Sequence, residues 1–392
     1  MPSDWKELMW GDIATLEYGK ALRTYQECNG KYPVYGTNGL IGWHERPLYN
    51  GEGVIIGRKG AYRGVHYSRA PFFVIDTAFY LKPKIKDLDM RFAYYELLTH
   101  DINSMDSGSA IPSTSRPEFY NLTVQLPPFE EQKLIGHILG TFDDKIQLNK
   151  QLNTTLEAIG QAVFKSYFVD FEFPNEEGKP YKSSGGQMVE SPLGEIPRGW
   201  KTGGLGDISE ITMGQSPPGE TYNEICEGVP FFQGIRDFGF RFPSKRVYCT
   251  APTRFAQEGD VLLSVRAPVG SLNIAKEPLA IGRGVASLRL KEKQNGFLYY
   301  LLLATRSAWD EFEAKGTVFG SATKQDVNDF KTIIPTKELR DKFGELVKPI
   351  DQKILLNEKE SITLMSIRDS LLPKLMSGKI RVPVNTKNME AL

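Results

Sequence analysis

The sequence predicts an α+β protein made by duplication: two similar mixed α/β domains separated by two long antiparallel helices that pair like a coiled coil. Residues 108–164 align without a gap onto residues 316–372, 208 positions further along the chain. In both copies apolar residues recur at alternating steps of three and four, as along a coiled-coil seam. The chain before each copy carries short β-branched runs and many glycines. A repeat this wide makes a duplicated unit, with pseudo-twofold symmetry, the basis of the fold.

The two copies share a block of five identical residues. They are Asp143, Lys145, Ile146, Leu148 and Asn149 in the first copy and Asp351, Lys353, Ile354, Leu356 and Asn357 in the second. Both asparagines stand in mid-seam, where a polar layer costs stability unless it fixes register or partner. We therefore expect the two helices to pack against each other. The packing residues predicted for this pair are Ile146, Asn149, Leu156, Ile354, Asn357 and Leu364.

The helix boundaries follow from proline and glycine positions. Pro127 and Pro128 favour a helix that begins directly after them. Gly140 in the first copy and Pro349 in the second fall at neighbouring places of the aligned unit, and both residue types weaken a helix. We therefore expect a kink or break between a short entry helix and a long helix, which in the first copy runs from Phe142 to about residue 169.

The remaining chain predicts two mixed β domains. Short strand-like runs at 33–35, 53–56 and 72–75 are separated by glycines, and a helix is expected near 90–99. Residues 200–334 repeat this layout loosely. The predicted organisation is a first variable domain (1–126), a first helical spacer (127–172), a Pro/Gly/Ser-rich linker (173–199), a second variable domain (200–334), a second helical spacer (335–382) and a frayed tail (383–392).

Composition narrows the class of protein. The chain has 392 residues, 24% of them charged, and a formal net charge of zero, so binding of nucleic acid by bulk charge is not expected, although local basic loops are compatible with it. The sequence contains no apolar run long enough to span a bilayer and no signal region. Three scattered cysteines fit a reducing compartment. We expect a cytoplasmic protein.

Motifs for catalysis are weak. Amino-methyltransferases of nucleic acids carry Asp, Asn or Ser before Pro-Pro and an aromatic residue after it. Leu126-Pro-Pro-Phe129 lacks the polar residue, and Ser216-Pro-Pro-Gly219 lacks the aromatic residue. No GxxxxGK[ST] phosphate loop occurs. The four histidines are His44, His66, His100 and His137, and none has a second ligand at metal spacing. We expect no catalytic site, metal or cofactor in this chain.

Two kinds of loop are candidates for DNA contact. The glycine-flanked loop at 57–64 carries Arg58, Lys59, Tyr62 and Arg63, which suit phosphates or guanine edges, and its counterpart at 264–270 keeps Arg266. The alternative for this loop is a solvated turn beside a strand. The hydroxyl-rich loops at 108–116 and 316–324 each end in a cation; the alternative for them is that Ser and Thr only cap the next helix. The candidates of the second kind are Ser113, Ser115, Arg116, Ser321, Thr323 and Lys324.

Six further residues in glycine-containing stretches are weaker candidates on residue type alone. They are Lys20, Arg23, Gln215, Gln233, Arg236 and Arg241. For each of them an ordinary surface charge or amide is the competing interpretation.

Several longer motifs resemble one family. They are LPPFEEQ (126–132), the block at 143–149, AVFKSYFVDF (162–171), PLGEIPRGW (192–200) and LLPKLMSGKI (371–380). Together they resemble the specificity subunit of type I restriction-modification systems, over essentially the whole chain. One departure is that Lys337 and Leu339 replace Phe129 and Glu131 of the first copy.

The resemblance implies two target-recognition domains held apart by two conserved antiparallel helices, each domain reading one half of a bipartite DNA site. It also implies a non-catalytic chain that joins two methyltransferase subunits, which methylate adenine with S-adenosylmethionine, and restriction/motor subunits, which use ATP and magnesium. Two other classes stay open at this point: a stand-alone DNA-modifying enzyme with unrecognised motifs, and a helical scaffold that binds protein or RNA.

Overall fold

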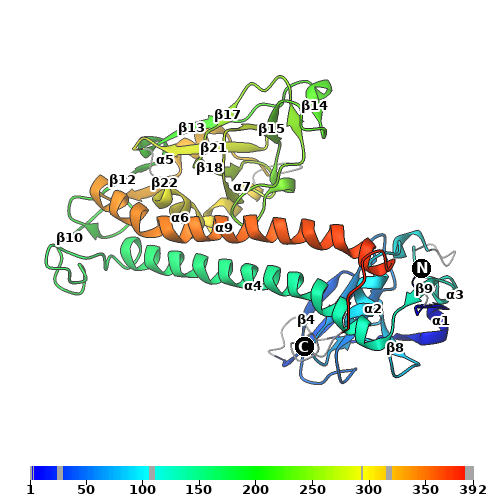
Figure 1. Ribbon diagram of the computed structural model, residues 1–392. Coiled ribbons are helices and arrows are strands. Elements are labelled where there is room, and N and C mark those ends of the chain that lie inside the picture. Colours follow the sequence, from blue (N-terminus) through cyan, green and yellow to red (C-terminus); the bar gives the residue numbers. More distant parts are fainter. Residues whose placement is uncertain are drawn as a thin grey trace. The chain divides into compact units, whose positions relative to one another are not determined.

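The computed structural model describes residues 2, 4–23, 30–105, 111–292, 295–314 and 320–384 (Figure 1). The chain forms two compact units: Met1–Leu148 with Glu360–Leu392, and Asn149–Lys359. Each unit contains one mixed α/β domain together with part of each of two long helices, α4 (Phe129–Phe168) and α9 (Lys337–Met376). No helix within the described ranges has the length and apolar character needed to cross a membrane.

The first unit contains nine strands and three short α-helices in its described part. The strands are β1 (Lys6–Met9), β2 (Ala14–Tyr18), β3 (Tyr32–Gly36), β4 (Gly39–His44), β5 (Gly53–Gly57), β6 (Val65–Ser68), β7 (Phe73–Val74), β8 (Ala78–Pro83) and β9 (Thr123–Leu126). The helices are α1 (Trp10–Ile13), α2 (Met90–Leu97) and α3 (Arg116–Tyr120), with a 3₁₀ turn η1 (Ile102–Ser104). The strand runs and the helix predicted from the sequence are confirmed.

Its main sheet is antiparallel, in the order β2-β8-β5-β6, and a second sheet has the order β4-β3-β7, in which β3 and β7 are parallel. Every residue of β5 is buried, as expected for a central strand covered on both faces. The N-terminus of α2 is capped by Asp89, whose side chain accepts a 2.7 Å hydrogen bond from the Phe92 amide. The core of this unit also includes Leu375 and Met376 from the end of α9.

The second unit repeats this plan with longer loops. Its domain strands are β12 (Lys201–Gly204), β13 (Ser209–Met213), β14 (Tyr222–Asn223), β15 (Val229–Phe232), β16 (Tyr248–Cys249), β17 (Phe255–Ala256), β18 (Val261–Ser264), β19 (Leu272–Ile274), β20 (Leu279–Ile281), β21 (Val285–Leu290) and β22 (Lys331–Ile334). Its shorter helices are α5 (Leu205–Ile208), α6 (Gly296–Ala304), α7 (Asp310–Ala314) and α8 (Lys324–Asp329), with 3₁₀ turns η2 (Gly219–Thr221), η3 (Ile235–Asp237) and η4 (Arg306–Trp309).

The strand orders of the two domains correspond. The sheet β13-β21-β18-β19 matches β2-β8-β5-β6, and the parallel pair β15/β20 matches β3/β7. The terminal pair β12/β22 likewise matches β1/β9. In the paired registers Tyr18 faces Phe79, and Met213 faces Ala286 at the corresponding place. The duplication predicted from the sequence is therefore present in the fold.

Both long helices are continuous over 40 residues, about 60 Å at roughly 1.5 Å per residue. Of the kink or break predicted at Gly140 and Pro349, the break is therefore wrong, and the kink stays a prediction. Gly140 serves packing instead, because a Cβ there would lie 1.9 Å from the Cζ atom of Arg91. On α9, Val347 and Ile354 are fully buried on either side of Pro349, and this packing offsets the loss of one helical hydrogen bond.

The start of α4 directly after Pro127 and Pro128 is as predicted, and α9 begins in a similar way after Pro335. The Gln132 amide donates to the Pro128 carbonyl, and its side chain donates to the Pro127 carbonyl at 2.9 Å. In the second copy the Arg340 side chain donates to the Pro335 carbonyl at 3.1 Å. Gln132 and Arg340 are related by the 208-residue offset. Two different side chains therefore make the same hydrogen bond, to the carbonyl of a proline five residues earlier, at the starts of the two helices.

The predicted pairing of the helices is confirmed. In the second unit Asn357 Nδ2 donates to Asn153 Oδ1 at 2.8 Å, and Asn149 Nδ2 donates to the Asn357 carbonyl at 3.4 Å. Further along, the rings of Phe164 and Phe343 lie 5.6 Å apart, so residue numbers rise on one helix as they fall on the other. Among the other predicted packing residues, Ile146 and Ile354 are buried, whereas Leu156 and Leu364 are half-buried.

The segment predicted as a linker (173–199) contains a strand pair in its second half and stacked aromatic rings near its start. Residues Met188–Val189 (β10) pair with Ile196–Pro197 (β11). The Phe173 ring stacks on Tyr181 at 4.6 Å and on Trp200 at 5.3 Å. Three parts of the chain named in the predictions lie outside the described residues. They are the predicted frayed tail from residue 385 onward, Cys28, and the first residues of the two hydroxyl-rich loops (108–110 and 316–319).

Candidate DNA interface

The first domain brings its two predicted loops together. Lys59, in the loop after β5, forms an isolated antiparallel bridge with Ser113. The Gly60 amide donates to the Pro112 carbonyl, and the Thr114 amide donates to the Arg58 carbonyl, both at 2.9 Å. Loops that are more than 50 residues apart in the chain therefore form one continuous surface beside the end of the main sheet.

The second domain builds the same junction from different residues. Arg266 forms the corresponding bridge with Ser321. The Ala322 amide donates to the Val265 carbonyl at 2.9 Å, as Thr114 does to Arg58. The counterpart loops predicted from the sequence thus have equivalent backbone hydrogen bonds. The loop at 57–64 carries three cationic residues, whereas the loop at 264–270 carries only Arg266.

An aromatic ring organises the arginines of the first domain. Arg58 and Arg116 place their Cζ atoms 4.9 and 5.2 Å from the centroid of the Tyr18 ring. Arg58 Nη1 donates to the Asp76 carbonyl at 2.7 Å. Arg116 donates from Nε and Nη2 to the Tyr120 hydroxyl at 3.2 and 2.9 Å. Tyr18 is not among the residues predicted from the sequence, since a single aromatic residue in a β-rich region is unremarkable.

Three further candidates of the first domain are exposed around this cluster. Lys20 and Lys59 are exposed, and Tyr62 retains 80% of its accessible surface. Arg63, by contrast, is only 3% exposed. Its Nη2 atom donates to the carbonyls of Ile102, Asn103 and Met105 at 2.6–3.2 Å. Arg63 therefore holds the loop in shape, and its guanidinium is not presented at the surface as predicted.

One hydroxyl residue in each hydroxyl-rich loop caps the helix that follows, which is one of the two interpretations left open by the sequence. Ser115 is the N-cap of α3 and accepts a hydrogen bond from the Glu118 amide at 3.4 Å. Thr323 is the N-cap of α8 and accepts one from the Asp326 amide at 3.2 Å. Capping therefore accounts for both. Arg116 and Lys324 follow as the first residues of these helices, so their side chains start from fixed positions.

In the second domain the candidates Gln215, Gln233, Arg236, Arg266, Ser321 and Lys324 are exposed. The Gln215 amide donates to the Ile281 carbonyl at 3.0 Å, as the Lys20 amide does to Val74 at 2.9 Å, so these residues occupy equivalent places. Gln233 Nε2 donates to Ser216 Oγ at 3.3 Å, and the same hydroxyl accepts from the Arg283 amide. The exposed Arg283, which is not among the residues predicted from the sequence, thus lies beside the two glutamines.

A family model described as "Type I restriction modification DNA specificity domain" matches residues 2–158 and 197–365, one match for each copy of the duplicated unit. The chain belongs to this family. Each specificity domain of the family model thus includes a variable β domain and most of the long helix that follows it.

Curated relatives carry the corresponding names. The putative type I restriction enzyme MjaX specificity subunit of Methanocaldococcus jannaschii is 36% identical over 274 residues, covering 69% of this chain and 62% of the relative. The MjaVIII specificity subunit of the same organism is 25% identical, covering 97% of this chain and 94% of the relative. The alignments with MjaX and with the MjaIX subunit span less than two thirds of those proteins, 62% and 66%. A crystal structure of the S subunit of a type I restriction-modification system from M. genitalium shares the fold, with a TM-score of 0.64 at 18% identity over 97% of both chains.

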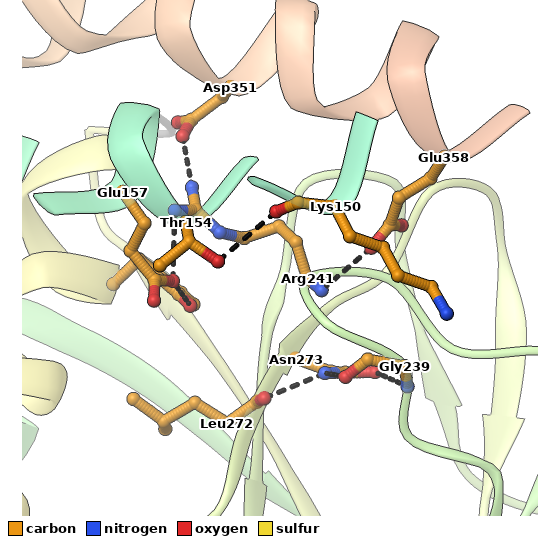
Figure 2. A network of polar contacts seen from close by, with 10 residues as sticks. Lys150, Thr154, Glu157, Gly239, Arg241, Leu272, Asn273, Asp351 and Glu358 are labelled. Atoms are coloured by element: carbon orange, nitrogen blue, oxygen red, sulfur yellow. Dashed lines mark hydrogen bonds and ion pairs between the residues drawn. The ribbon is translucent and has the colours of Figure 1, made fainter. Parts of the chain in front are cut away.

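The second specificity domain is fastened to both long helices through Arg241 (Figure 2). Its Nη1 donates to Asp351 of α9, and its Nη2 donates to Glu157 of α4 at 3.2 Å. Its amide donates to Glu358 at 3.1 Å, and its Cζ lies 4.2 Å from the Tyr299 ring centroid. Arg241 is fully buried. The weak prediction that it contacts DNA is therefore wrong, because its charge is used inside the second unit.

Burial shifts the pKa values of the charged groups in this network. Desolvation raises the pKa of the Asp351 and Glu358 carboxyls, although contact with Arg241 works in the opposite direction. Desolvation also opposes the charge on Arg241, but the surrounding Tyr299, Tyr300 and Asp351 raise its pKa overall. Gly160 of α4 makes room for this arrangement, because a Cβ there would lie 2.2 Å from the Tyr300 hydroxyl.

The first specificity domain is fastened at the equivalent aspartate. Asp143 of α4, which the 208-residue offset relates to Asp351, accepts hydrogen bonds from Tyr95 of α2 and from Arg368 of α9. The equivalent aspartates of the repeated block thus each bind a side chain of the adjoining domain, Tyr95 in the first unit and Arg241 in the second. In the described part of the chain no group of three or more His, Cys, Asp or Glu side chains is placed to hold a metal ion.

Proposed function

We propose that this chain is the DNA-sequence-recognition subunit of a type I restriction-modification complex, with each specificity domain reading one half of a bipartite site. The observation that carries the proposal is the matched loop junction, Lys59 with Ser113 and Arg266 with Ser321, which has the same backbone and different side chains in the two domains. Cations, amides and hydroxyls at such a junction suit phosphate and base-edge contacts in a groove of duplex DNA.

The two half-sites are expected to differ in sequence. Residues at equivalent backbone positions are unlike: Tyr18 corresponds to Met213, Arg58 to Val265 and Arg116 to Lys324. Arg offers two parallel donors to a base or phosphate, Lys offers a point charge, and Val and Met offer neither. Unlike side chains at like positions therefore select unlike base pairs, while the shared backbone keeps a common mode of docking.

The proposed partners are double-stranded DNA, two methyltransferase subunits and restriction/motor subunits in the cytoplasm. S-adenosylmethionine, ATP and magnesium then belong to those subunits, and this chain performs recognition without catalysis. Exposed apolar residues on the long helices support docking of two like partners. Leu148 (47% exposed) and Ile159 (47%) on α4 are repeated as Leu356 (59%) and Ile367 (41%) on α9. Surfaces duplicated at the same offset suit two copies of one subunit.

We further propose that the paired helices set the separation of the two half-sites, with the domain boundaries at 1–126, 127–172, 200–334 and 335–382. A fixed separation along a duplex selects spacer length and leaves spacer sequence free. The aspartate anchors at Asp143 and Asp351 would hold each specificity domain on the helices during docking. A stand-alone enzyme or an RNA scaffold is not favoured, because every curated relative described above is named a specificity subunit.

The test is a genome-wide map of methylated adenine in host cells with this chain and with its gene deleted. We expect a bipartite motif, with a fixed non-specific spacer, that is methylated only when the chain is present. Complementation with the intact chain should restore the same motif. An unchanged methylation map after deletion would refute the proposal. Methylation of DNA by the purified chain alone with S-adenosylmethionine would instead support an enzyme.

A further inference from the structure

We infer that Tyr18 is a positioning residue for base selectivity in the first domain: it aligns Arg58 and Arg116 as a pair of guanidinium groups that bind guanine edges in one half-site. The inference rests on the proposed function and adds to it which residues select the base and which base they select. Tyr18 comes from the end of β2, Arg58 from the loop after β5, and Arg116 from the start of α3.

The tyrosine ring is itself held in place while half of it faces solvent. Its edge packs on Phe79 with ring centroids 5.0 Å apart, and 49% of Tyr18 remains exposed. Arg58 and Arg116 both lie within cation–π distance of this ring. A single aromatic residue therefore restrains two guanidinium groups that are 58 positions apart in the sequence.

Hydrogen bonds fix which edge of each guanidinium is left for a ligand. Arg116 donates the Nε hydrogen and one of the two Nη2 hydrogens to the Tyr120 hydroxyl. The edge formed by Nη1 and the second Nη2 hydrogen is left for a ligand. Arg58 uses Nη1 on the Asp76 carbonyl, which leaves the edge formed by Nε and Nη2. Among the described residues neither arginine forms an ion pair with a carboxylate. Each guanidinium thus keeps a two-donor edge, the arrangement that fits O6 and N7 of guanine.

The backbone around these side chains is restrained as well. The Arg58 amide donates to the Thr77 carbonyl at 2.9 Å, and its own carbonyl accepts from the Thr114 amide at 2.9 Å. The Thr114 hydroxyl is buried and donates to the Gly57 carbonyl at 2.7 Å. A guanidinium that is already oriented loses less conformational freedom on binding, so it discriminates between bases better than a freely moving side chain of the same charge.

The second domain lacks this cluster at the equivalent positions. Met213 replaces Tyr18 and Ala286 replaces its support Phe79, so neither ring is present there. Val265 replaces Arg58, and Lys324 replaces Arg116. The selectivity assigned to Tyr18 therefore belongs to one half-site, and the other half-site serves as an internal control in the same molecule.

The experiment uses the native complex, purified from the host through a tag on this chain, with duplexes that carry the mapped methylation motif. Every single-base-pair variant of both half-sites is measured by competition, at several salt concentrations, for wild type, Tyr18→Met and Tyr18→Phe. Tyr18→Met introduces the residue of the second domain, whereas Tyr18→Phe keeps the ring. Arg58→Ala identifies the half-site of the first domain.

We expect Tyr18→Met to lower discrimination at one or two G·C pairs of one half-site by about tenfold or more. Discrimination in the other half-site should stay within about twofold, which also reports an intact fold. Tyr18→Phe should retain most of the wild-type discrimination, and Arg58→Ala should relax one of the same base pairs. The salt dependence of Tyr18→Met should match wild type, since both arginines keep their charge.

Three results would overturn the inference. Discrimination could be unchanged in both half-sites, which would show that the ring does not position a reading group. It could be lost equally in both half-sites, which a local positioning role cannot produce. Affinity could fall evenly for all duplexes, which would identify the arginines as phosphate contacts. In each case the wild-type complex still reads its bipartite motif, so the proposed function stands; a wild-type complex that shows no motif would refute the proposed function instead.

Discussion

Asn357 donates a 2.8 Å hydrogen bond from its side-chain nitrogen to the side-chain oxygen of Asn153 in the buried seam between α4 and α9. The Asn357 carbonyl also accepts a bond from Asn149, so three asparagines form one polar layer. An alternative pairing register would leave these amides buried against aliphatic side chains. The layer therefore specifies one antiparallel pairing of the helices.

Replacing Asn357 with alanine should destabilise the protein by about 1–3 kcal/mol, because the buried Asn153 oxygen loses its donor. Urea unfolding followed by circular dichroism measures the change. Lys353→Ala, on an exposed position of the same helix, is the matched control and should lie within about 0.5 kcal/mol of wild type. Equal midpoints for the two variants would show that the layer does not contribute to stability.

Arg241→Met should have a larger effect, about 3–5 kcal/mol, since it leaves Glu157 and Asp351 around a buried site without the guanidinium that they bind. Lys245→Met removes an exposed ion pair with Glu277 from the same loop and should cost about 0–1 kcal/mol. Thermal and urea unfolding of both variants provide the comparison. A small effect of Arg241→Met would mean that the fully buried guanidinium is dispensable for fastening the domain.

His100 makes the stability of the first unit depend on pH. Its hydrogen bond to Glu96, at 2.8 Å, raises the pKa of the His100 imidazole above 6.5. The folded protein therefore holds this proton more tightly than the unfolded chain. The resulting stabilisation is fully present below pH 6.5 and is lost as pH rises through the folded pKa. In unfolding experiments across this range, His100→Asn should lose stability relative to wild type at low pH and approach it at high pH; a constant difference would contradict the assignment.

Arg58→Ala should weaken DNA binding by about 1–3 kcal/mol and relax one position of one half-site. Arg266→Ala in the equivalent loop of the second domain should affect only the other half-site. Binding to single-base variants over a range of salt concentrations measures both effects. If Arg58 contacts phosphate, all duplexes will bind more weakly and the salt slope will fall by about one. No change in affinity or in salt slope would exclude this loop from the interface.

Insertion of four residues into the middle of both long helices tests their role in spacing. Each insertion adds about 6 Å of helix, which corresponds to roughly two base pairs of duplex. We expect the methylated motif to keep both half-sites and to lengthen its spacer by about two base pairs. Insertion into one helix alone should abolish methylation because the asparagine layer loses its register. An unchanged spacer after the double insertion would count against the helices as a ruler.

The sequence by itself determined the duplication, the two paired helices and the class of protein. These follow from local and periodic signals: a fixed 208-residue offset, an apolar seam with Asn149 and Asn357 at matching places, and prolines at 127 and 335 that open the helices. These signals are properties of the sequence alone, so they can be identified without knowing which residues are in contact in the folded protein.

Only the tertiary structure decided which polar residues face solvent. Arg58, Arg63 and Arg241 look alike as cations beside glycines, yet Arg63 binds three backbone carbonyls, Arg241 is buried among carboxylates, and Arg58 lies on Tyr18. It also decided that Gly140 and Pro349 do not break their helices, because packing on either side outweighs the local tendency of these residues to break a helix. Long-range packing determines such outcomes, and residues distant in the sequence, such as Tyr18 and Arg116, carry no local sign of their contact.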